Sequence, residues 1–383
     1  MKVILLNRLE QLIQELCPEG VEYVKLNTIA KRNSGTNITA SQMKSLHKDG
    51  APVRVFAAGN TIADVDYDAV PAKNVITTPS IITKSRGYIG FEYYFKPFTH
   101  KSEMWSYTVI NEFTDTKFIY YYLLTKVNAL QKKARSDSVK LPQLSIKDTD
   151  NIQIPLPPVS VQCEIVRILD NFTELTAELT RELTAELKAR KKQYEYYRDN
   201  LLDFGDKSQM MPLGDILKIK NGKDYKAFNA GDIPVYGTGG IMTYIDTFAY
   251  DKPSVLIPRK GSLDKLYYVD KPFWTVDTIF YSEININKAI PKYVFYCLQK
   301  ERLNKYNTAG GVPSLTQTLL NKVEISVPSL PEQERIVKIL DRFVKLCNDI
   351  SEGLAAEIEA RKQQYEYYRN KLLTFKEVSH EKL

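Results

Sequence analysis

The sequence predicts an α+β protein in which two similar α/β modules are separated by two long antiparallel helices that form an intramolecular coiled coil. Three observations predict this arrangement. The run 162–204 is repeated at 333–375 without a gap and with 23 identities in 43 positions. Both copies place apolar residues at steps of three and four, which is typical of a coiled-coil seam. The segments before the two copies match only in short motifs, so two divergent modules alternate with two closely similar helices.

The length and composition indicate a globular protein. A chain of 383 residues can form two or three domains, each with its own core. No apolar run approaches the ~20 residues that a membrane span needs. The stretch Met1–Leu6 is too short for the apolar core of a signal peptide. We therefore expect a cytoplasmic protein.

The cysteines and histidines argue against a metal site. Cys17, Cys163, Cys297 and Cys347 are far apart and include no Cys-x-x-Cys pair. The three histidines are scattered as well. We expect the cysteines to be reduced and structural, and we expect no bound metal.

The net charge of +7 lies in the two modules. Residues 1–157 contribute +5 and residues 205–328 contribute +4, whereas the two long helices together contribute −2. Basic surface of this kind suits a phosphate backbone, but such small values also fit a mildly basic solvated surface. Charge alone leaves both interpretations open.

The first module is expected over residues 1–157. It begins with a helix over residues 1–17, whose apolar series Leu5, Leu9, Leu12 and Leu16 would let it pack near the long helices. The run Val75–Ile82 predicts a strand. Dense glycine and proline punctuation indicates many loops around a curved sheet.

The long helices are expected over residues 158–204 and 329–375. Prolines stand just before each one, where a missing N–H is tolerated, and Gly205 can end the first. A helix of about 43 residues is roughly 65 Å long and cannot bury its seam alone. The other copy is the nearest partner, and the module between them makes antiparallel pairing easy. The seam residues are Ile165, Ile168, Phe172, Leu175, Leu179, Leu183, Leu187, Tyr194, Tyr197 and Leu201, and then Ile336, Ile339, Phe343, Leu346, Ile350, Leu354, Ile358, Tyr365, Tyr368 and Leu372.

The second module is expected over residues 205–328, and residues 376–383 form a short tail. Short motifs in the same order relate this module to the first, so we expect one fold with different loops, which suits one task performed on two targets. The matched motifs are Leu26–Ile29 with Leu213–Ile216, Gly35 with Gly222, Ser85–Gly87 with Arg259–Gly261, Phe118–Leu123 with Tyr293–Leu298, and Pro142–Leu144 with Pro313–Leu315.

Residues outside the seam are also repeated, although helix pairing does not require them. One interpretation is that both helices present the same surface to two copies of one partner; a solvated helix face is the alternative, and the sequence leaves both open. Recent duplication is a weaker account, because the modules would have had the same time to diverge. The repeated residues are Arg190, Lys191, Tyr196 and Arg198 in the first copy, and Arg361, Lys362, Tyr367 and Arg369 in the second.

Motifs of catalysis are missing from the sequence. The run Gly237–Gly240 is not a phosphate-binding loop, because no Gly-x-x-x-x-Gly-Lys-Ser/Thr pattern occurs. We find neither an Asn-Pro-Pro-Tyr-type base-methylation motif nor a Gly-x-Ser-x-Gly elbow. The chain is therefore predicted not to be an enzyme by itself.

The whole layout resembles the specificity subunit of type I restriction-modification systems. The resemblance rests on Ile154–Pro158 and Val327–Glu334, which lead into the helices, on the two Ile-Val-x-Ile-Leu-Asp runs, and on the Tyr-Glu-Tyr-Tyr-Arg ends at 194–198 and 365–369. Residues 160–162 read Ser-Val-Gln where the family usually has Pro-Glu-Gln, and we expect this to affect only local capping.

The resemblance implies a DNA-binding subunit in which two target-recognition domains each read one half of a split, asymmetric site on double-stranded DNA. The helices would set the spacer and dock two methyltransferase (M) subunits, and restriction (R) subunits would complete the complex. No cofactor is expected in this chain; S-adenosylmethionine, ATP and Mg would be bound by the partner subunits. Two modules related by a pseudo-two-fold axis would match the symmetry of duplex DNA.

Arg and Lys on loops make the commonest contacts with bases and phosphates, which selects candidates for DNA binding. For Gly87 and Gly261 a shared turn is the plainer interpretation. The DNA-binding candidates are Lys84, Arg86 and Tyr88, then Lys140 and Gln143 in a nearby loop, and Arg259, Lys260 and Ser262 in the second module.

The alternative function is a stand-alone helical adaptor that binds protein partners.

Overall fold

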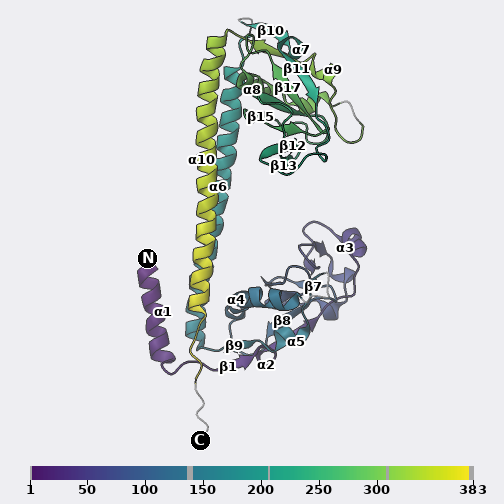
Figure 1. Ribbon diagram of the computed structural model, residues 1–383. Coiled ribbons are helices and arrows are strands. Elements are labelled where there is room, and N and C mark those ends of the chain that lie inside the picture. Colours follow the sequence, from purple (N-terminus) through teal and green to yellow (C-terminus); the bar gives the residue numbers. More distant parts are fainter. Residues whose placement is uncertain (1, 136–140, 206–207, 308–309, 379–383) are drawn as a thin grey trace. The chain divides into compact units, whose positions relative to one another are not determined.

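The computed structural model describes residues 2–135, 141–205, 208–307 and 310–378 (Figure 1). The chain divides into two compact units, one of Met1–Thr180 with Glu357–Leu383 and one of Arg181–Ala356. The division passes through both long helices, so each unit holds one module and a part of each helix.

The first module contains a four-stranded antiparallel sheet in the order β2-β8-β5-β6, a three-stranded sheet in the order β4-β3-β7, and a two-stranded ribbon of β1 and β9. In the three-stranded sheet β3 pairs with β4 antiparallel and with β7 parallel. The strands are β1 (Tyr23–Lys25), β2 (Ala30–Ser34), β3 (Val53–Phe56), β4 (Ile62–Val65), β5 (Ser80–Lys84), β6 (Gly90–Tyr94), β7 (Phe98–His100), β8 (Trp105–Val109) and β9 (Gln153–Pro155).

The second module repeats this plan with every strand number raised by nine. Its sheets run β11-β17-β14-β15 and β13-β12-β16, and its ribbon pairs β10 with β18. The parallel pair recurs as β12 with β16. The strands are β10 (Gln209–Pro212), β11 (Leu217–Asn221), β12 (Ile233–Gly237), β13 (Gly240–Ile245), β14 (Ser254–Pro258), β15 (Tyr267–Val269), β16 (Trp274–Thr275), β17 (Ile279–Ile284) and β18 (Glu324–Val327).

The central strands β5 and β14 are buried on both faces. Ile81 belongs to the large core of the first unit, whereas its neighbour Ile82 packs with Phe98 in a separate cluster on the opposite face. In the second unit Val255 and Leu256 divide between two clusters in the same way. Because alternate side chains of a strand point to opposite faces, a strand buried on both faces can carry neighbouring apolar residues, as at Ile81–Ile82 and Val255–Leu256.

Short helices surround the sheets of both modules. In the first, α4 begins with Asp115 as its N-cap, whose carboxylate accepts a hydrogen bond from the N–H of Phe118 at 2.9 Å. In the second, α8 begins with Pro291, whose missing N–H costs nothing at a first turn. The α-helices of the modules are α1 (Lys2–Leu16), α2 (Leu26–Ile29), α3 (Ala40–Leu46), α4 (Thr116–Ala134), α5 (Ile146–Asp150), α7 (Leu213–Ile216), α8 (Pro291–Glu301) and α9 (Gln317–Leu320), and the 3-10 turns include Tyr67–Ala69, Ala72–Asn74 and Leu303–Tyr306.

The two long helices are α6 (Val159–Leu201) and α10 (Leu330–Leu372). In the first unit the ring of Phe172 stacks on Tyr368 at 5.8 Å, so the first half of α6 meets the end of α10. In the second unit Tyr197 stacks on Phe343 at 5.4 Å, so the end of α6 meets the first half of α10. Both contacts require antiparallel helices, which confirms the predicted pairing and fold class. Across the described residues no helix is both long and apolar enough to cross a membrane.

Two residues expected in the seam lie outside it. Leu175 and Leu346, at equivalent positions of the repeat, are 56% and 59% exposed. A helix of 3.6 residues per turn drifts away from a pattern of repeated four-residue steps, so apolar spacing does not identify every residue that faces the partner helix. The prediction was wrong for these two leucines.

Two further expectations about the first module need correction. The strand predicted over Val75–Ile82 begins only at Ser80, because Pro79 has no N–H for a ladder bond, and Ile76 forms an isolated bridge. In α1, Leu9 is buried in the same core as residues of α6, but Leu16 is 45% exposed and Ile13 packs against that core in its place.

Gly35 and Gly222 occupy equivalent positions directly after β2 and β11. A Cβ atom on Gly35 would lie 2.4 Å from the carbonyl oxygen of Lys101, and one on Gly222 would lie 2.0 Å from that of Val276. These are far closer than atoms can approach, so only glycine lets the chain pass from one sheet to the other here.

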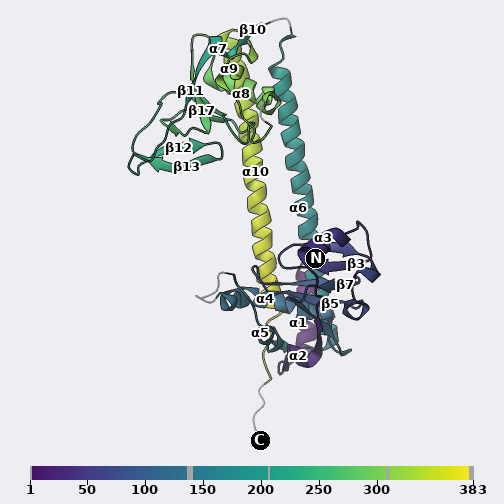
Figure 2. The same ribbon diagram turned by 90° about the vertical axis from the view of Figure 1, so that its right-hand side faces the viewer.

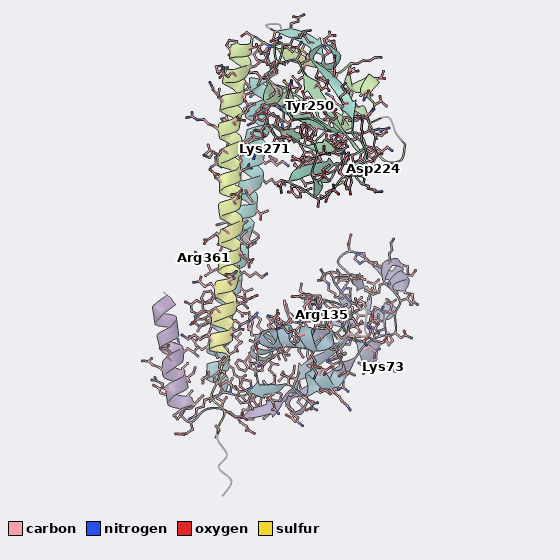
Figure 3. All side chains as sticks on the ribbon, viewed as in Figure 1. Lys73, Arg135, Asp224, Tyr250, Lys271 and Arg361 are labelled. Atoms are coloured by element: carbon pink, nitrogen blue, oxygen red, sulfur yellow. The ribbon has the colours of Figure 1, made fainter. Side chains whose placement is uncertain are left out.

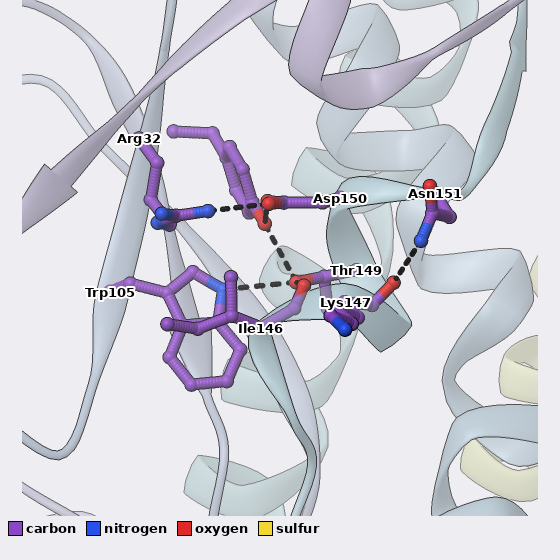
Figure 4. A network of polar contacts seen from close by, with 8 residues as sticks. Arg32, Trp105, Ile146, Lys147, Thr149, Asp150 and Asn151 are labelled. Atoms are coloured by element: carbon purple, nitrogen blue, oxygen red, sulfur yellow. Dashed lines mark hydrogen bonds and ion pairs between the residues drawn. The ribbon is translucent and has the colours of Figure 1, made fainter.

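A polar network holds α5 on the large sheet of the first module (Figure 4). The indole N–H of Trp105 donates to the hydroxyl of Thr149 at 3.0 Å. The hydroxyl of Tyr107 donates to the carboxylate of Asp150 at 2.6 Å, and Arg32 also binds this carboxylate. Thr149 is completely buried. The network therefore supplies the hydrogen bonds that these buried polar groups require.

Candidate nucleic-acid interface

The turn that follows β5 is held by backbone bonds to a distant segment. Gly87 has a φ of 75°, in the left-handed region that favours glycine. Its N–H donates to the carbonyl of Pro142 at 2.9 Å, and the N–H of Leu144 donates to the carbonyl of Ser85 at 2.9 Å. The side chain of Gln131 on α4 adds a bond to the carbonyl of Gly87 at 3.2 Å and accepts one from the N–H of Ile89 at 2.8 Å. The turn is thus fixed from two sides.

The turn that follows β14 is held in the same way. Gly261 has a φ of 88°. Its N–H donates to the carbonyl of Pro313 at 2.9 Å, and the N–H of Leu315 donates to the carbonyl of Arg259 at 2.9 Å. The bonds link Arg259–Gly261 to Pro313–Leu315, as those of the first module link Ser85–Gly87 to Pro142–Leu144. The sequence had matched both of these motifs between the modules. Both modules therefore present a rigid turn at the same place.

The candidate side chains of the first turn differ in the contacts that they make within the module. Lys84 forms an ion pair with Glu92 on β6 at 2.9 Å, which commits its charge within the sheet. Arg86 is exposed and donates to the side-chain oxygen of Gln143 at 3.1 Å, so the structure brings these two candidates together. Tyr88 is 76% exposed. Lys140 lies outside the described residues.

The second turn carries different side chains. Arg259 is half-buried; its guanidinium carbon lies 5.9 Å from the ring centre of Phe280 and a guanidinium N–H reaches the carbonyl of Asp277 at 3.4 Å. Lys260 and Ser262 are exposed. Arg259 is therefore anchored to its own module, whereas Lys260 extends into solvent.

Sequence reasoning missed the hairpin beside this turn. The run Gly237–Gly240 joins β12 to β13, and the hydroxyl of Thr238 donates to the carbonyl of Thr278 at 2.8 Å. The carbonyl of Thr238 accepts from the hydroxyl of Tyr267 at 3.0 Å. The absence of a Gly-x-x-x-x-Gly-Lys-Ser/Thr pattern had excluded a phosphate loop here, but no pattern indicated that this tip would lie beside the turn that carries Arg259 and Lys260.

On the long helices, Arg190 and Arg361 make the same contacts at equivalent positions. Arg190 pairs with Glu186 at 2.8 Å and Arg361 pairs with Glu357 at 2.8 Å. Both side chains remain about half exposed, and Arg361 projects from α10 (Figure 3). Lys191 and Lys362, the next residues, are also exposed. These repeated charges lie on solvent-facing helix surface.

The tyrosine pairs divide into one packed and one exposed ring. Tyr196 is 64% exposed and Tyr367 is 62% exposed. Each lies edge-on to the next tyrosine, Tyr197 or Tyr368, and that second ring stacks across the helix pair. The structure thus places Tyr196 and Tyr367 on the surface at both repeats.

Arg198 and Arg369 are more enclosed than the other members of the predicted helix face. Arg198 is buried, lies 5.7 Å from the ring centre of Tyr194 and pairs with Asp199 at 2.7 Å. Arg369 is half-buried and lies 5.7 Å from the ring of Tyr365. Burial raises the pKa of Tyr194 to about 12. Both arginines thus cover neutral tyrosine rings and offer little open surface.

A metal-binding arrangement is not evident in the described ranges. Within them, no group of three or more His, Cys, Asp or Glu side chains is placed to hold a metal ion. The only histidine in the cores of these ranges is His100, and its ring nitrogens lie 3.2 Å from the Ser106 hydroxyl and 3.2 Å from the Lys101 carbonyl. Its position is explained by packing.

Comparison with known proteins gives a consistent result. The family model of the type I restriction modification DNA specificity domain matches residues 18–189 and again residues 205–360. The specificity subunit of the Escherichia coli type I restriction enzyme EcoR124I/EcoR124II is 30% identical over 395 residues, covering 93% of this chain and 94% of that protein. A Haemophilus influenzae protein assigned as a type I restriction enzyme specificity subunit is 37% identical over 286 residues, covering 68% of this chain and 72% of its own length.

The fold also has a counterpart among solved structures. A chain from a structure of the type I R-M system superposes with a TM-score of 0.72 at 15% identity, covering 93% of this chain and 98% of that one. Such low identity shows likeness of fold alone. Together with the two matches to the family model, one for each module, it confirms the resemblance seen in the sequence: the chain belongs to the family of type I restriction-modification specificity subunits.

Proposed function

We propose that this chain reads a two-part, asymmetric site on double-stranded DNA, with one half recognised by each module. The observation that carries the proposal is the repeated nine-strand plan, in which two equivalent turns have the same backbone bonds but different side chains. A fixed turn positions its side chains, and different side chains select different bases. One scaffold used twice can thus read two unlike half-sites.

Arg86 and Lys260 are the best-placed candidates for reading DNA. Both are exposed on turns that the backbone holds in place. Arginine can make two parallel hydrogen bonds with guanine, and lysine can bind guanine or phosphate. Tyr88, Gln143 and Ser262 remain candidates of the same surfaces, as do Lys84 and Arg259, which would first have to release contacts within the module.

The long helices are proposed to set the spacer between the half-sites and to dock two methyltransferase subunits. Several exposed residues recur at both copies, which suits two identical partners. Exposed leucines and tyrosines would supply apolar contact area, and the arginines would supply directed polar bonds. These residues are Arg190, Lys191, Tyr196 and Leu175, with Arg361, Lys362, Tyr367 and Leu346 as their counterparts.

The chain itself is proposed to be non-catalytic and to act in the cytoplasm. The methyltransferase subunits would bind S-adenosylmethionine, and restriction subunits would bind ATP and Mg in the full complex. The test is methylation of a randomised DNA library by the chain alone and by the chain with methyltransferase subunits. Sequencing of modified DNA should give one two-part motif for the complex and none for the chain alone. Methylation by the chain alone would refute the proposal.

One exchange and one insertion test whether the modules determine the half-sites and the long helices determine the gap. Replacing residues 30–140 by those of a relative should change one half-site and leave the gap unchanged. Inserting residues between Leu179 and Leu187 of α6 should change the gap and leave both half-sites unchanged. An altered gap in the first experiment, or an unaltered gap in the second, would contradict the assignment.

The alternative, a helical adaptor that binds protein partners, makes a different prediction about salt. Affinity for duplex DNA should fall steeply as salt rises, because bound cations leave the phosphates when lysine and arginine contact them. An adaptor would show no salt-dependent binding to duplex DNA. A gel-shift titration at several salt concentrations separates the two functions.

A further inference from the structure

The junction between each module and its long helix contains a buried glutamine and, further along the long helix, a partly exposed aspartate. In the second unit Gln333, in the first turn of α10, is completely buried. Its side-chain oxygen accepts from the N–H of Ile290 at 2.8 Å, at the start of α8. Its amide nitrogen donates to the carbonyl of Lys288 at 3.1 Å and to that of Pro328 at 2.9 Å. One side chain thus ties the start of the module helix to the start of the long helix.

A second contact lies further along the same two helices. Asp341 accepts from the ammonium group of Lys292 at 2.9 Å and from the hydroxyl of Tyr296 at 2.5 Å, both on α8. Helix α8 lies beside α10 (Figure 2). The ammonium group of Lys292 also lies 5.3 Å from the ring centre of Tyr268 on β15. Asp341 comes eight residues after Gln333, a rise of about 12 Å along an α-helix.

The glutamine contact recurs in the first unit. Gln162 is completely buried in the first turn of α6. Its oxygen accepts from the N–H of Asp115 at 2.8 Å, at the start of α4. Its nitrogen donates to the carbonyl of Phe113 at 3.0 Å and to that of Pro157 at 2.7 Å. The three bonds match those of Gln333 one for one.

The aspartate contact recurs as well, again eight residues along the long helix. Asp170 accepts from Lys117 at 2.7 Å and from the hydroxyl of Tyr121 at 2.6 Å, both on α4. The ammonium group of Lys117 lies 5.5 Å from the ring centre of Tyr93 on β6. The pattern of carboxylate, lysine, tyrosine and covering ring is therefore the same in both units.

Two separated contacts constrain a helix far more than one does. Between the two polar contacts, Ile336 and Leu340 are completely buried in the core that they share with α8. Apolar burial of this kind is non-directional, so the two polar contacts, about 12 Å apart along the long helix, are what give the junction a defined direction.

The carboxylates of Asp341 and Asp170 are 37% and 38% exposed, so solvent screens their ion pairs with lysine. The bonds that they accept from the tyrosine hydroxyls have a charged acceptor and are stronger than neutral hydrogen bonds. Tyr121 and Tyr296 are buried. Burial is the main cause that raises the pKa of each hydroxyl, and the adjacent carboxylate raises it further, so both hydroxyls remain donors.

We infer that Gln162 with Asp170, and Gln333 with Asp341, are two-point clamps that fix the angle of each module on its long helix and thereby the gap that a two-part DNA site must have. The inference rests on the proposed function. The four residues are positioning residues and need not touch DNA. The long helices alone would fix only the distance between their two ends. The clamps also fix how each module is oriented on its helix, and therefore where its reading turn lies.

The aspartate end of each clamp is the part that can be loosened without unfolding the junction. Without Asp341 the module would still be held by Gln333 and by the apolar packing of Ile336 and Leu340, but it would lose one of its two directional contacts, so its angle on α10 would vary more. Half-sites one base pair further apart are shifted by about 3.4 Å and rotated by roughly 35° around the duplex, so a module whose angle varies more could reach them. The reading turns lie within the modules and are unchanged, so the half-site sequences should not change.

The test uses the full chain assembled with methyltransferase subunits. Asp341→Ala, Asp341→Asn and the equivalent Asp170 variants would methylate a DNA library whose gap lengths vary. We expect methylation at gaps one base pair from the preferred length to rise about tenfold relative to the preferred gap, as loss of a charged hydrogen bond implies. Glu332→Gln is the matched control: Glu332 pairs with Arg335 on the same helix at 2.6 Å, and its variant should keep the native preference.

A variant that keeps a sharp gap preference despite loss of the aspartate contact would overturn the inference. Tyr296→Phe removes one bond to Asp341 and keeps the ring, so it provides the same test if the alanine variant does not fold. A smaller loss of gap preference in Tyr296→Phe supports the clamp, and an unchanged preference counts against it. Failure of the proposed function is distinct, because the unsubstituted complex would then give no two-part motif in the same library.

Discussion

Replacing Gln333 with alanine should strongly destabilise the second unit. The side chain is completely buried and makes three hydrogen bonds, all to backbone groups. Removing it leaves the N–H of Ile290 and the carbonyls of Lys288 and Pro328 without these bonds. Because the partners belong to the backbone, they stay in place whatever residue stands at 333 and still require hydrogen bonds.

The magnitude follows from these three bonds. Each net hydrogen bond contributes about 1 kcal/mol, and each buried group left without a partner costs about 1–3 kcal/mol. Truncation to alanine also leaves a cavity, which raises the cost further. We expect a loss of at least 3 kcal/mol in the free energy of unfolding. Gln162→Ala should cost the first unit a similar amount, since its bonds are equivalent.

Urea unfolding followed by tryptophan fluorescence measures this loss. Gln333→Met keeps most of the volume, so the difference between Met and Ala variants isolates the cavity contribution. Gln317→Ala is the control, because that glutamine makes one surface hydrogen bond, to Asn221 at 3.2 Å, and its loss should cost within about 0.5 kcal/mol. A loss below about 1 kcal/mol for both Gln333 variants would refute the assignment of a stabilising buried junction.

Three further predictions follow from single sites. Gly222→Ala should lower the unfolding free energy of the second unit by about 2 kcal/mol or more, since the new Cβ would lie 2.0 Å from the carbonyl oxygen of Val276; a smaller loss would mean that the two segments can separate. Burial lowers the pKa of His100, so the unfolded chain binds a proton more readily and unfolding free energy should fall as pH drops below about 6.5; His100→Gln should reduce that slope, and an equal slope would contradict it. Arg86→Ala should relax only one half-site in a methylation assay and Lys260→Ala only the other, whereas a uniform loss of binding would indicate phosphate contact.

The repeat in the sequence predicted the long helices because apolar spacing reports local geometry directly, and the module that lies between the two copies predicted their antiparallel pairing. It did not predict which apolar residues face the partner helix, as the exposure of Leu175 and Leu346 shows. Spacing defines a stripe, but the position of the module and the other helix decides which part of the stripe is covered.

The clamps could not be predicted although their residues were in the repeated motifs. Asp170 and Asp341 were visible as identities between the copies, and Tyr121 and Tyr296 lay in matched aromatic runs. Nothing in the one-dimensional pattern pairs a residue with another 45 or 49 positions away. Such pairing depends on how α4 and α8 pack, which only the three-dimensional structure supplies.

The modules differ at one polar network whose interacting side chains have changed together. The network of Figure 4 joins Arg32 and Asp150 in the first module, whereas register and sequence spacing put Ile219 and Asn321 at these positions in the second. Leu320 replaces buried Thr149 and packs in the apolar core. A polar network of side chains can thus be exchanged for apolar packing, because every member is free to be replaced.

The glutamine contacts cannot be exchanged for apolar packing in this way. Gln162 and Gln333 bind N–H and carbonyl groups of the backbone, which every sequence retains and which must keep partners when buried. A change to an apolar residue leaves those groups unsatisfied, and no second change can remove them. This asymmetry explains physically why the glutamine contacts are alike in both units while the reading turns differ.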